Sequence, residues 1–344
     1  MKKVISSVSI IISLVVVSIS ITGCKNHSEK IITSDLENDL AKQLTEINKK
    51  IADDSKNAAL YNQRAELYIK SEKLNNALSD VNKAITLDAR LPINYLTLSD
   101  IYLLQGKPGK ALEAIHKSIS IDNKYTEAYV RLAKLYLVMK DYEKTGENIN
   151  KVLNLDPNNA KAYFLRGFAL EENGDTIKAV ESFQKAVALD PQYFEAYIEL
   201  GSLYALKKSS LAAGYFNSAL NIKPTNKETL YMLGMFYQEN NQPDQSLAIY
   251  KRMINLDSAN KLPYYNSGYV NLVYLNKFKE GAEFFTKAIK IDPKYLEAYF
   301  NRGYCYELAG DAAKAHLDYE KALKITPNYP NAIEGLNRLD KLSK

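Results

Sequence analysis

A short phrase of apolar, acidic and turn-forming residues recurs through most of this 344-residue chain at a nearly constant interval. It is clearest as Leu189-Asp190-Pro191 and Ile291-Asp292-Pro293, and successive versions lie 33 to 35 residues apart. A fixed period of this length is typical of stacked repeats, in which each unit buries its apolar face against its neighbours. The other six versions end at Ala89, Asn123, Pro157, Pro224, Ser258 and Pro327.

Each repeat contains two apolar patterns with helical spacing. Large, small and large residues occur four and then three positions apart, as in Tyr197, Gly201 and Tyr204. A companion pattern follows later in the repeat, as in Ala179, Phe183 and Ala186. Because residues four and seven positions apart lie on one face of an α-helix, each repeat is predicted to contain two amphipathic helices.

Glycine occupies the small position of several predicted first helices, although it costs about 1 kcal/mol relative to alanine inside a helix. We therefore expect the first helix to cross the second helix closely at this position, with an alanine opposite. The glycines are Gly167, Gly201, Gly234 and Gly303, and the alanines are Ala179, Ala212 and Ala315. Other glycines are expected to adopt left-handed backbone in the turns between the two helices, namely Gly106, Gly174 and Gly310.

These spacings, with the proline that closes many repeats, resemble those of the tetratricopeptide-repeat family over residues 58–327. The resemblance implies an all-α fold, an α-α superhelix or solenoid of about eight helix-turn-helix repeats. Residues 35–57 are expected to form an N-terminal capping helix, and residues 328–344 a C-terminal capping helix. The resemblance also implies a concave surface that is lined by the first helices and binds peptide segments or partner helices.

The N-terminus has the order of an export signal: two lysines, an uncharged apolar run over residues 4–21, and small residues before a cysteine. Ile21-Thr22-Gly23-Cys24 resembles the lipobox of bacterial lipoproteins, which implies acylation of Cys24. Residues 1–23 are then a lipoprotein signal peptide, and residues 24–34 the lipidated cysteine and a tether. Two alternatives stay open, an uncleaved transmembrane helix and a secretory peptide that is cleaved without lipidation.

The outward positions of the predicted first helices differ between the two halves of the chain. One residue after the small position, early repeats carry Glu66, Asp100 and Lys134, whereas later repeats carry mostly aromatic residues. An exposed aromatic groove would suit an apolar or extended peptide, and the alternative is that neighbouring repeats bury these rings. The predicted partner-binding residues are Phe164, Phe168, Tyr231, Met235, Tyr265, Tyr269, Phe300 and Tyr304.

One specific ligand class is not supported. Tetratricopeptide domains that bind a C-terminal carboxylate use lysine, asparagine and arginine at set positions of successive first helices. Asn266 and Asn301 match single elements of this set, but Glu297 stands where a lysine is needed, and no arginine completes it.

Patterns that enzymes and metal sites require do not occur in the sequence. Without a GxSxG, GxGxxG or phosphate-loop pattern, we expect neither enzyme activity nor a cofactor. The three histidines are far apart and there is no HExxH or CxxC pair, so no metal site is expected. Cys305 is expected to be a small core residue. The net charge is +5, or +3 without Lys2 and Lys3, which predicts no nucleic-acid partner.

Together these features predict a membrane-anchored scaffold or adaptor that binds a partner protein or peptide in its concave groove. Lys25, directly after the cysteine, favours the outer membrane, and the scarcity of acids near it favours the periplasmic side of the bacterial cell envelope. Two alternatives are an assembly lipoprotein, pilotin-like, for a pilus or secretion complex, and an adaptor of peptidoglycan enzymes. The pathway and the oligomeric state stay open at this point.

Overall fold

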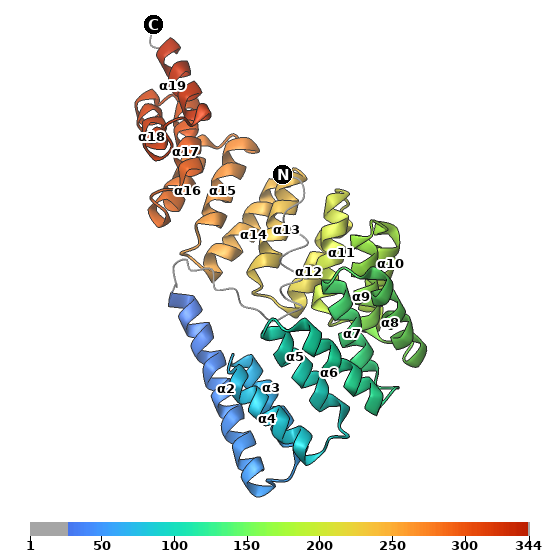
Figure 1. Cartoon of the computed structure of the whole chain (residues 1–344). Coiled ribbons are helices and arrows are strands. Elements are labelled where there is room, and N and C mark those ends of the chain that lie inside the picture. The colour runs from blue at the N-terminus through green and yellow to red at the C-terminus, as the bar shows by residue number, and fades with distance from the viewer. Residues whose placement is uncertain (1–26, 343–344) are drawn as a thin grey trace. The chain divides into compact units, whose positions relative to one another are not determined.

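The computed structural model describes residues 27–342, which form eighteen α-helices and no β-strand (Figure 1). The chain divides into two compact units, with unit 1 ending at Tyr193 and unit 2 beginning at Phe194. The helices of unit 1 are α2 (His27–Asp53), α3 (Ala58–Lys70), α4 (Leu74–Leu87), α5 (Pro92–Leu104), α6 (Pro108–Ile121), α7 (Thr126–Val138), α8 (Tyr142–Leu155), α9 (Ala160–Glu172) and α10 (Thr176–Leu189). Those of unit 2 are α11 (Phe194–Leu206), α12 (Leu211–Ile222), α13 (Lys227–Glu239), α14 (Pro243–Leu256), α15 (Lys261–Val273), α16 (Phe278–Ile291), α17 (Leu296–Leu308), α18 (Ala312–Ile325) and α19 (Pro330–Leu342).

Helices α3 to α18 form consecutive helix-turn-helix pairs, and within each unit these pairs follow one another side by side (Figure 1). Eight pairs occupy residues 58–325, which confirms the predicted all-α repeat fold. First helices of neighbouring repeats contact one another, as α3 contacts α5 and α15 contacts α17. The first helices of each unit therefore share one face.

Polar residues and glycines explain where the helices begin and end. Asn159 caps α9 and Asp175 caps α10, because each side chain accepts a hydrogen bond from an otherwise unpaired backbone N–H of the first turn. Gly174 and Gly310 have φ angles of 84° and 81°, so the left-handed backbone expected in these turns is confirmed.

The glycines in the middle of the first helices lie against an aromatic ring of the second helix. A Cβ atom at Gly167 would lie 2.5 Å from the ring of Phe183, and one at Gly303 would lie 2.9 Å from the ring of Tyr319. No side chain fits at such distances, so the predicted close crossing is confirmed. The nearest atoms belong to the ring rather than to the alanine expected opposite, because helical side chains lean back toward the preceding turn.

Helix α2 is longer than predicted. The sequence predicts a tether over residues 24–34, but α2 begins at His27, so the predicted boundary is wrong for residues 27–34. Ile32 continues the four-residue apolar spacing of the rest of the helix, which favours helix over tether. Near its other end, Ile47 and Ile51 are buried in a cluster with apolar residues of α3 and attach α2 to the first repeat.

Helix α19 covers the last repeat of unit 2. The Tyr319 ring lies between Gly303 of α17 and Gly335 of α19. A Cβ atom added at Gly335 would lie 2.5 Å from the ring. The Tyr319 hydroxyl donates a hydrogen bond of 2.5 Å to Glu307, and Arg338 of α19 donates one of 2.7 Å to the same carboxylate. Packing and a shared carboxylate thus hold α19 in place.

Two ion pairs that the repeat pattern does not reveal join the first and second helices of the first and last repeats. Arg64 donates to both carboxylate oxygens of Asp80, at 2.6 and 2.7 Å. Arg302 contacts Asp318 in the same way, at 2.7 and 2.6 Å. Both carboxylates are buried, and bidentate geometry of this kind fixes the angle between the paired helices.

The two irregular repeats differ where the sequence indicates an insertion or deletion. In the fifth repeat, α12 begins at Leu211 and has 12 residues, whereas the second helices of the other repeats have 14. In the seventh repeat, α15 keeps its helical frame and Gly268 still faces the ring of Phe285. The additional residue lies in the turn between α15 and α16.

Candidate functional site

Two of the predicted groove residues are not available to a partner. Phe164 and Phe168 are only 2% and 6% exposed, so their predicted outward position is wrong. The Phe164 ring lies 5.1 Å from that of Phe168, 5.6 Å from that of Phe183 and 4.8 Å from that of Tyr193, all within unit 1. This aromatic cluster buries both side chains, because the Phe183 ring, which lies against Gly167, contacts both of them.

The other six predicted residues lie on one face of unit 2 and are half-buried. We call this set the aromatic face; it consists of Tyr231 and Met235 on α13, Tyr265 and Tyr269 on α15, and Phe300 and Tyr304 on α17. Two asparagines join neighbouring helices beneath it. Asn266 lies 3.8 Å from the sulfur of Met235, and Asn301 donates a hydrogen bond of 2.9 Å to the hydroxyl of Tyr265.

Ring contacts hold the aromatic face in a defined shape. Tyr265 lies 4.9 Å from Tyr295, and Phe300 lies 5.7 Å from Tyr329 in an edge-on arrangement. Phe300 and Tyr304 are nearly parallel, with centroids 6.3 Å apart. Rings that are already ordered lose little conformational entropy when a partner binds.

The phenol of Tyr265 stays neutral at ordinary pH. Burial, aided by the negative charge of Glu297, raises the pKa of Tyr265 to about 12. Burial and the nearby hydroxyl of Tyr265 also raise the pKa of Tyr295 well above its ordinary value. Tyr265 and its neighbour Tyr295 therefore offer apolar rings and neutral hydrogen-bonding hydroxyls rather than charges.

In unit 1 the corresponding face is ionic. Arg131 forms an ion pair with Asp100 and another, of 3.2 Å, with Glu127. Lys161 lies 3.2 Å from the same glutamate. Burial and the neighbouring Arg131 lower the pKa of Lys134. These ion pairs give this face of unit 1 a charged character, whereas the face of unit 2 carries half-buried rings.

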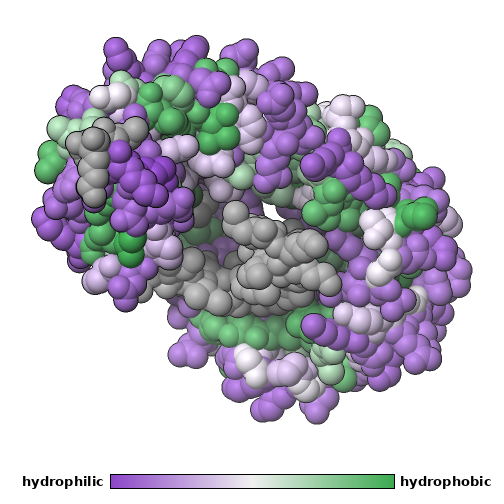
Figure 2. Space-filling view, turned by 90° about the horizontal axis from the view of Figure 1, so that it is seen from above, coloured by the Kyte–Doolittle hydropathy of each residue, from purple (hydrophilic) through white to green (hydrophobic). Residues whose placement is uncertain are grey.

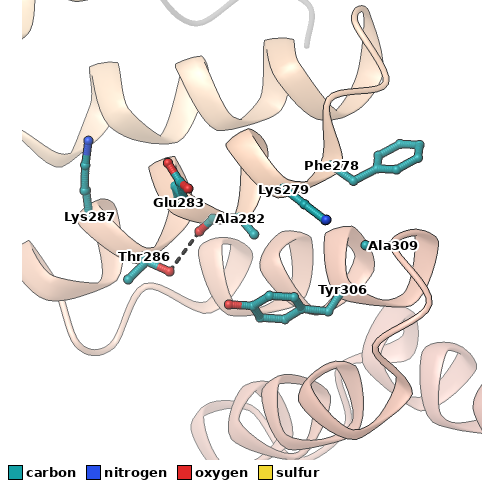
Figure 3. A pocket seen from close by; sticks show the side chains of 8 residues that line it. All are labelled: Phe278, Lys279, Ala282, Glu283, Thr286, Lys287, Tyr306 and Ala309. Carbon is teal, nitrogen blue, oxygen red and sulfur yellow. Dashed lines mark hydrogen bonds between the residues drawn. The ribbon is translucent and has the colours of Figure 1, made fainter.

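A pocket of about 480 Å³ lies between α16 and the end of α17, and the sequence patterns did not indicate it (Figure 3). Tyr306 and Ala282 form part of its apolar lining, while Lys279, Glu283 and Lys287 supply charges. None of its lining residues belongs to the aromatic face. Because it is open and partly apolar, this pocket is an alternative binding surface, and its residues serve as controls for binding at the aromatic face.

Exposed apolar residues also occur singly elsewhere. Leu206 is 82% exposed, Ile177 70% and Leu317 64%. Figure 2 shows hydrophilic residues over much of the face in view, with hydrophobic residues in separate patches. Isolated residues of this kind are normal for a protein surface, so the ordered set of rings distinguishes the candidate site better than exposure does.

Glu171, in the last turn of α9, is a half-buried titratable group outside these faces. One of its carboxylate oxygens has no hydrogen-bond partner among the described residues. Burial, with a contribution from the negative charge of Glu172, raises the pKa of Glu171 from 4.5 to about 7.

The free energy of unfolding is therefore expected to fall as pH rises from about 4.5 to about 7, because the unfolded chain ionises Glu171 first. Glu171→Gln cannot ionise and should recover about 1 to 2 kcal/mol above this window, after allowance for solvent screening. Thermal melts at about pH 5 and about pH 8 measure this. Glu181→Gln, at an exposed position on α10, retains Glu171 and should therefore differ from the unaltered protein by the same small amount at both pH values. A constant difference between Glu171→Gln and the unaltered protein would contradict the prediction.

Of the two cysteines, only Cys305 lies within the described residues. Cys305 is buried and unpaired within the described residues, and burial raises its thiol pKa to about 12, as suits the predicted core residue. Cys24 lies outside the described residues, as does the predicted signal peptide over residues 1–23. Within residues 27–342, no helix is both long and apolar enough to span a bilayer.

Comparison with known proteins identifies the family. Sequence models described as tetratricopeptide repeat match seven segments that together cover more than half of the chain. These segments are residues 58–90, 94–125, 126–159, 160–193, 215–248, 263–295 and 284–316. The chain belongs to the tetratricopeptide-repeat family, whose fold class suits protein–protein interaction.

Similarity to individual proteins is local. Human tetratricopeptide repeat protein 6 is 46% identical over 61 residues, which are 17% of this chain and 12% of that protein. The probable UDP-N-acetylglucosamine–peptide N-acetylglucosaminyltransferase SPINDLY of Solanum lycopersicum is 35% identical over 91 residues, or 26% of this chain and 10% of that protein. The chain thus spans about a tenth of either relative.

A solved structure shares the fold over a longer stretch. The C-terminal part of a TPR repeat-containing protein from Cytophaga hutchinsonii is 20% identical to this chain, with a TM-score of 0.61. The match covers 70% of this chain and 98% of that structure. At this identity it shows a common fold.

Proposed function

We propose that this protein is a non-catalytic scaffold that docks a segment of a partner protein across the aromatic face of unit 2. The observation that carries the proposal is the continuity of this face across α13, α15 and α17, where Asn266 and Asn301 join neighbouring helices. Half-buried rings on adjacent helices provide apolar contacts over several residues of an extended segment.

The position of the rings favours binding over a purely structural role. Tyr269 and Tyr304 are only partly covered by the chain, whereas Phe168, at the equivalent position of unit 1, is buried. Aromatic residues that are ordered yet accessible dominate the binding energy of many interfaces, because they bury a large area at a small entropic cost.

Placement of a photoreactive benzoylphenylalanine in the full chain tests the docking site. At position 269 it should crosslink a partner in cells, because this ring belongs to the aromatic face. At position 306, which lines the pocket between α16 and α17, it should not crosslink that partner. The double variant Tyr269→Ala, Tyr304→Ala should reduce the partner's affinity at least tenfold, about 1.4 kcal/mol or more. The matched control Tyr306→Ala should preserve it, and the reverse result would place the docking site at the pocket.

We further propose that Cys24 carries lipid and anchors the scaffold in the bacterial outer membrane, facing the periplasm. The support is the order of charge, apolar run and small residues before Cys24. Two or more acyl chains give stable anchoring, whereas one gives weak and reversible binding.

Cys24→Ala is expected to abolish incorporation of labelled fatty acid and to move the protein from the membrane to the soluble fraction. Cys305→Ala is the matched control, because that thiol is buried in unit 2. Metabolic labelling followed by fractionation of the cell envelope makes the measurement. Retention of unlabelled Cys24→Ala protein in the membrane would instead favour the uncleaved transmembrane alternative.

A further inference from the structure

We infer that the aromatic face of unit 2 selects partner segments that carry lysine or arginine side chains between apolar residues. This inference rests on the proposed docking function and names the chemical class of the partner. It follows from three observations about charge around the face.

First, two carboxylates at the face have no basic partner in residues 38–341. Glu297 is exposed in the first turn of α17, and Glu239 is exposed at the end of α13. Glu297 lies one helical turn before Asn301, whose side chain hydrogen-bonds Tyr265, and its charge contributes to the raised pKa of Tyr265. Glu239 lies one helical turn after Met235 on α13. A negative charge at the C-terminal end of a helix is unfavourable for the helix dipole, so Glu239 has no evident role in stabilising α13.

Second, the chain already binds two of its own cations with a ring and a carboxylate. Lys261 lies 4.3 Å from the ring centroid of Tyr295 and 2.5 Å from the carboxylate of Asp292.

Arg338 repeats this arrangement at the other end of the face. Its guanidinium lies 5.5 Å from the ring centroid of Tyr304 and 2.7 Å from the carboxylate of Glu307. Tyr265 and Glu297 offer a ring and a carboxylate as well, but no cation of the described residues lies over the Tyr265 ring.

Third, two cations that border the face are already engaged by other carboxylates. Lys227 lies 2.9 Å from Asp257, and Lys261 is paired with Asp292. The carboxylates of Glu239 and Glu297 have no such partner, and their complement is a positively charged side chain. Each cation over a tyrosine ring contributes about 0.5 to 1 kcal/mol at an exposed site, and an exposed ion pair contributes a similar amount.

Selection from a random phage-displayed library of peptides about twelve residues long, over the immobilised full chain, tests the inference without assuming a partner. Binders are sorted by whether they lose binding to the double variant Tyr269→Ala, Tyr304→Ala. Those that depend on the aromatic face should be enriched in lysine and arginine and depleted in aspartate and glutamate. Binders that do not depend on it serve as the internal reference.

A synthetic face-dependent peptide then provides the quantitative measurement by fluorescence anisotropy. Replacing its basic residues with glutamine should weaken binding to the full chain about tenfold at low salt, and the difference should shrink as salt increases. The variant Glu239→Gln, Glu297→Gln should lose most of this discrimination. Glu283→Gln, which changes an exposed glutamate at the pocket between α16 and α17, should retain it.

The outcomes separate the two proposals. Face-dependent binders that are neutral or acidic, or discrimination that survives Glu239→Gln, Glu297→Gln, would overturn the charge selectivity and leave the docking function standing. A library with no face-dependent binder would overturn both.

Discussion

Replacing Phe164 with alanine is expected to lower the free energy of unfolding by about 3 to 5 kcal/mol. The Phe164 ring is 2% exposed and contacts the rings of Phe168, Phe183 and Tyr193. Its removal forfeits the buried apolar area and leaves a cavity that the rigid helix pairs fill only in part. Urea unfolding monitored by circular dichroism measures the loss as a lower midpoint with an unchanged slope.

The matched control for Phe164→Ala is Ile177→Ala on α10, because that side chain is 70% exposed in the same unit. It should change the free energy of unfolding by no more than about 0.5 kcal/mol. If Phe164→Ala were as mild as this control, the ring would have to be accessible in solution, and the original prediction that it lines a groove would regain support.

The second large effect concerns the close crossing of α17 and α18. Gly303→Leu should destabilise unit 2 by about 1 to 3 kcal/mol or more, because a Cβ at this position would lie 2.9 Å from the ring of Tyr319 and 3.1 Å from the Cβ of Asp318. Tyr319 is held from its other side by Gly335, so the ring has little room to move. A lower melting temperature and earlier exchange of α19 amide protons should both result, since α19 packs on the same ring.

Gly214→Leu is a stringent control for this argument. Gly214 also lies inside a helix of unit 2, but nothing lies within 4 Å of an added Cβ there. Leucine has the higher helix propensity, so this variant should be neutral or more stable by up to about 1 kcal/mol. Equal destabilisation by the two glycine replacements would contradict the ring contact as the cause of the effect at Gly303.

Binding and stability have different expected patterns across the two units. Alanine replacements of Phe164 and Phe168 should lower the free energy of unfolding. Those of Tyr269 and Tyr304 should mainly lower the affinity for the partner. The distinction follows from burial. A buried ring does not contact a partner, so its removal does not weaken binding, whereas a half-buried ring contributes less to the stability of the core.

Much of the fold could be predicted because the regular period of the repeat indicates the helix pairs directly. Tyr197, Gly201 and Tyr204 define one helix face on their own, and the same spacing in other repeats removes ambiguity between helix and strand. The beginning of α2 at His27 was not predicted, because that helix belongs to no repeat and depends on a weaker apolar pattern.

The candidate site could be predicted only in part. The chain alone indicates which residues occupy equivalent positions of the first helices, so it could place the six residues of the aromatic face on a common side of their helices. It gives no measure of how deeply each ring lies, and Phe164 and Phe168 were therefore misplaced. The pairing of Arg64 with Asp80, and the unpaired Glu239 and Glu297, also depend on distances between helices that no spacing rule contains.

What the sequence by itself determined is the repeating pair of amphipathic helices, because a periodic pattern of large and small residues dictates helix faces and close crossings locally. What only the tertiary structure decided is which aromatic rings are core and which remain accessible, and which charges lack a partner. Burial and ion pairing are sums over neighbours from several helices, and residues at equivalent positions of the repeat, such as Phe168 and Tyr304, receive different neighbours.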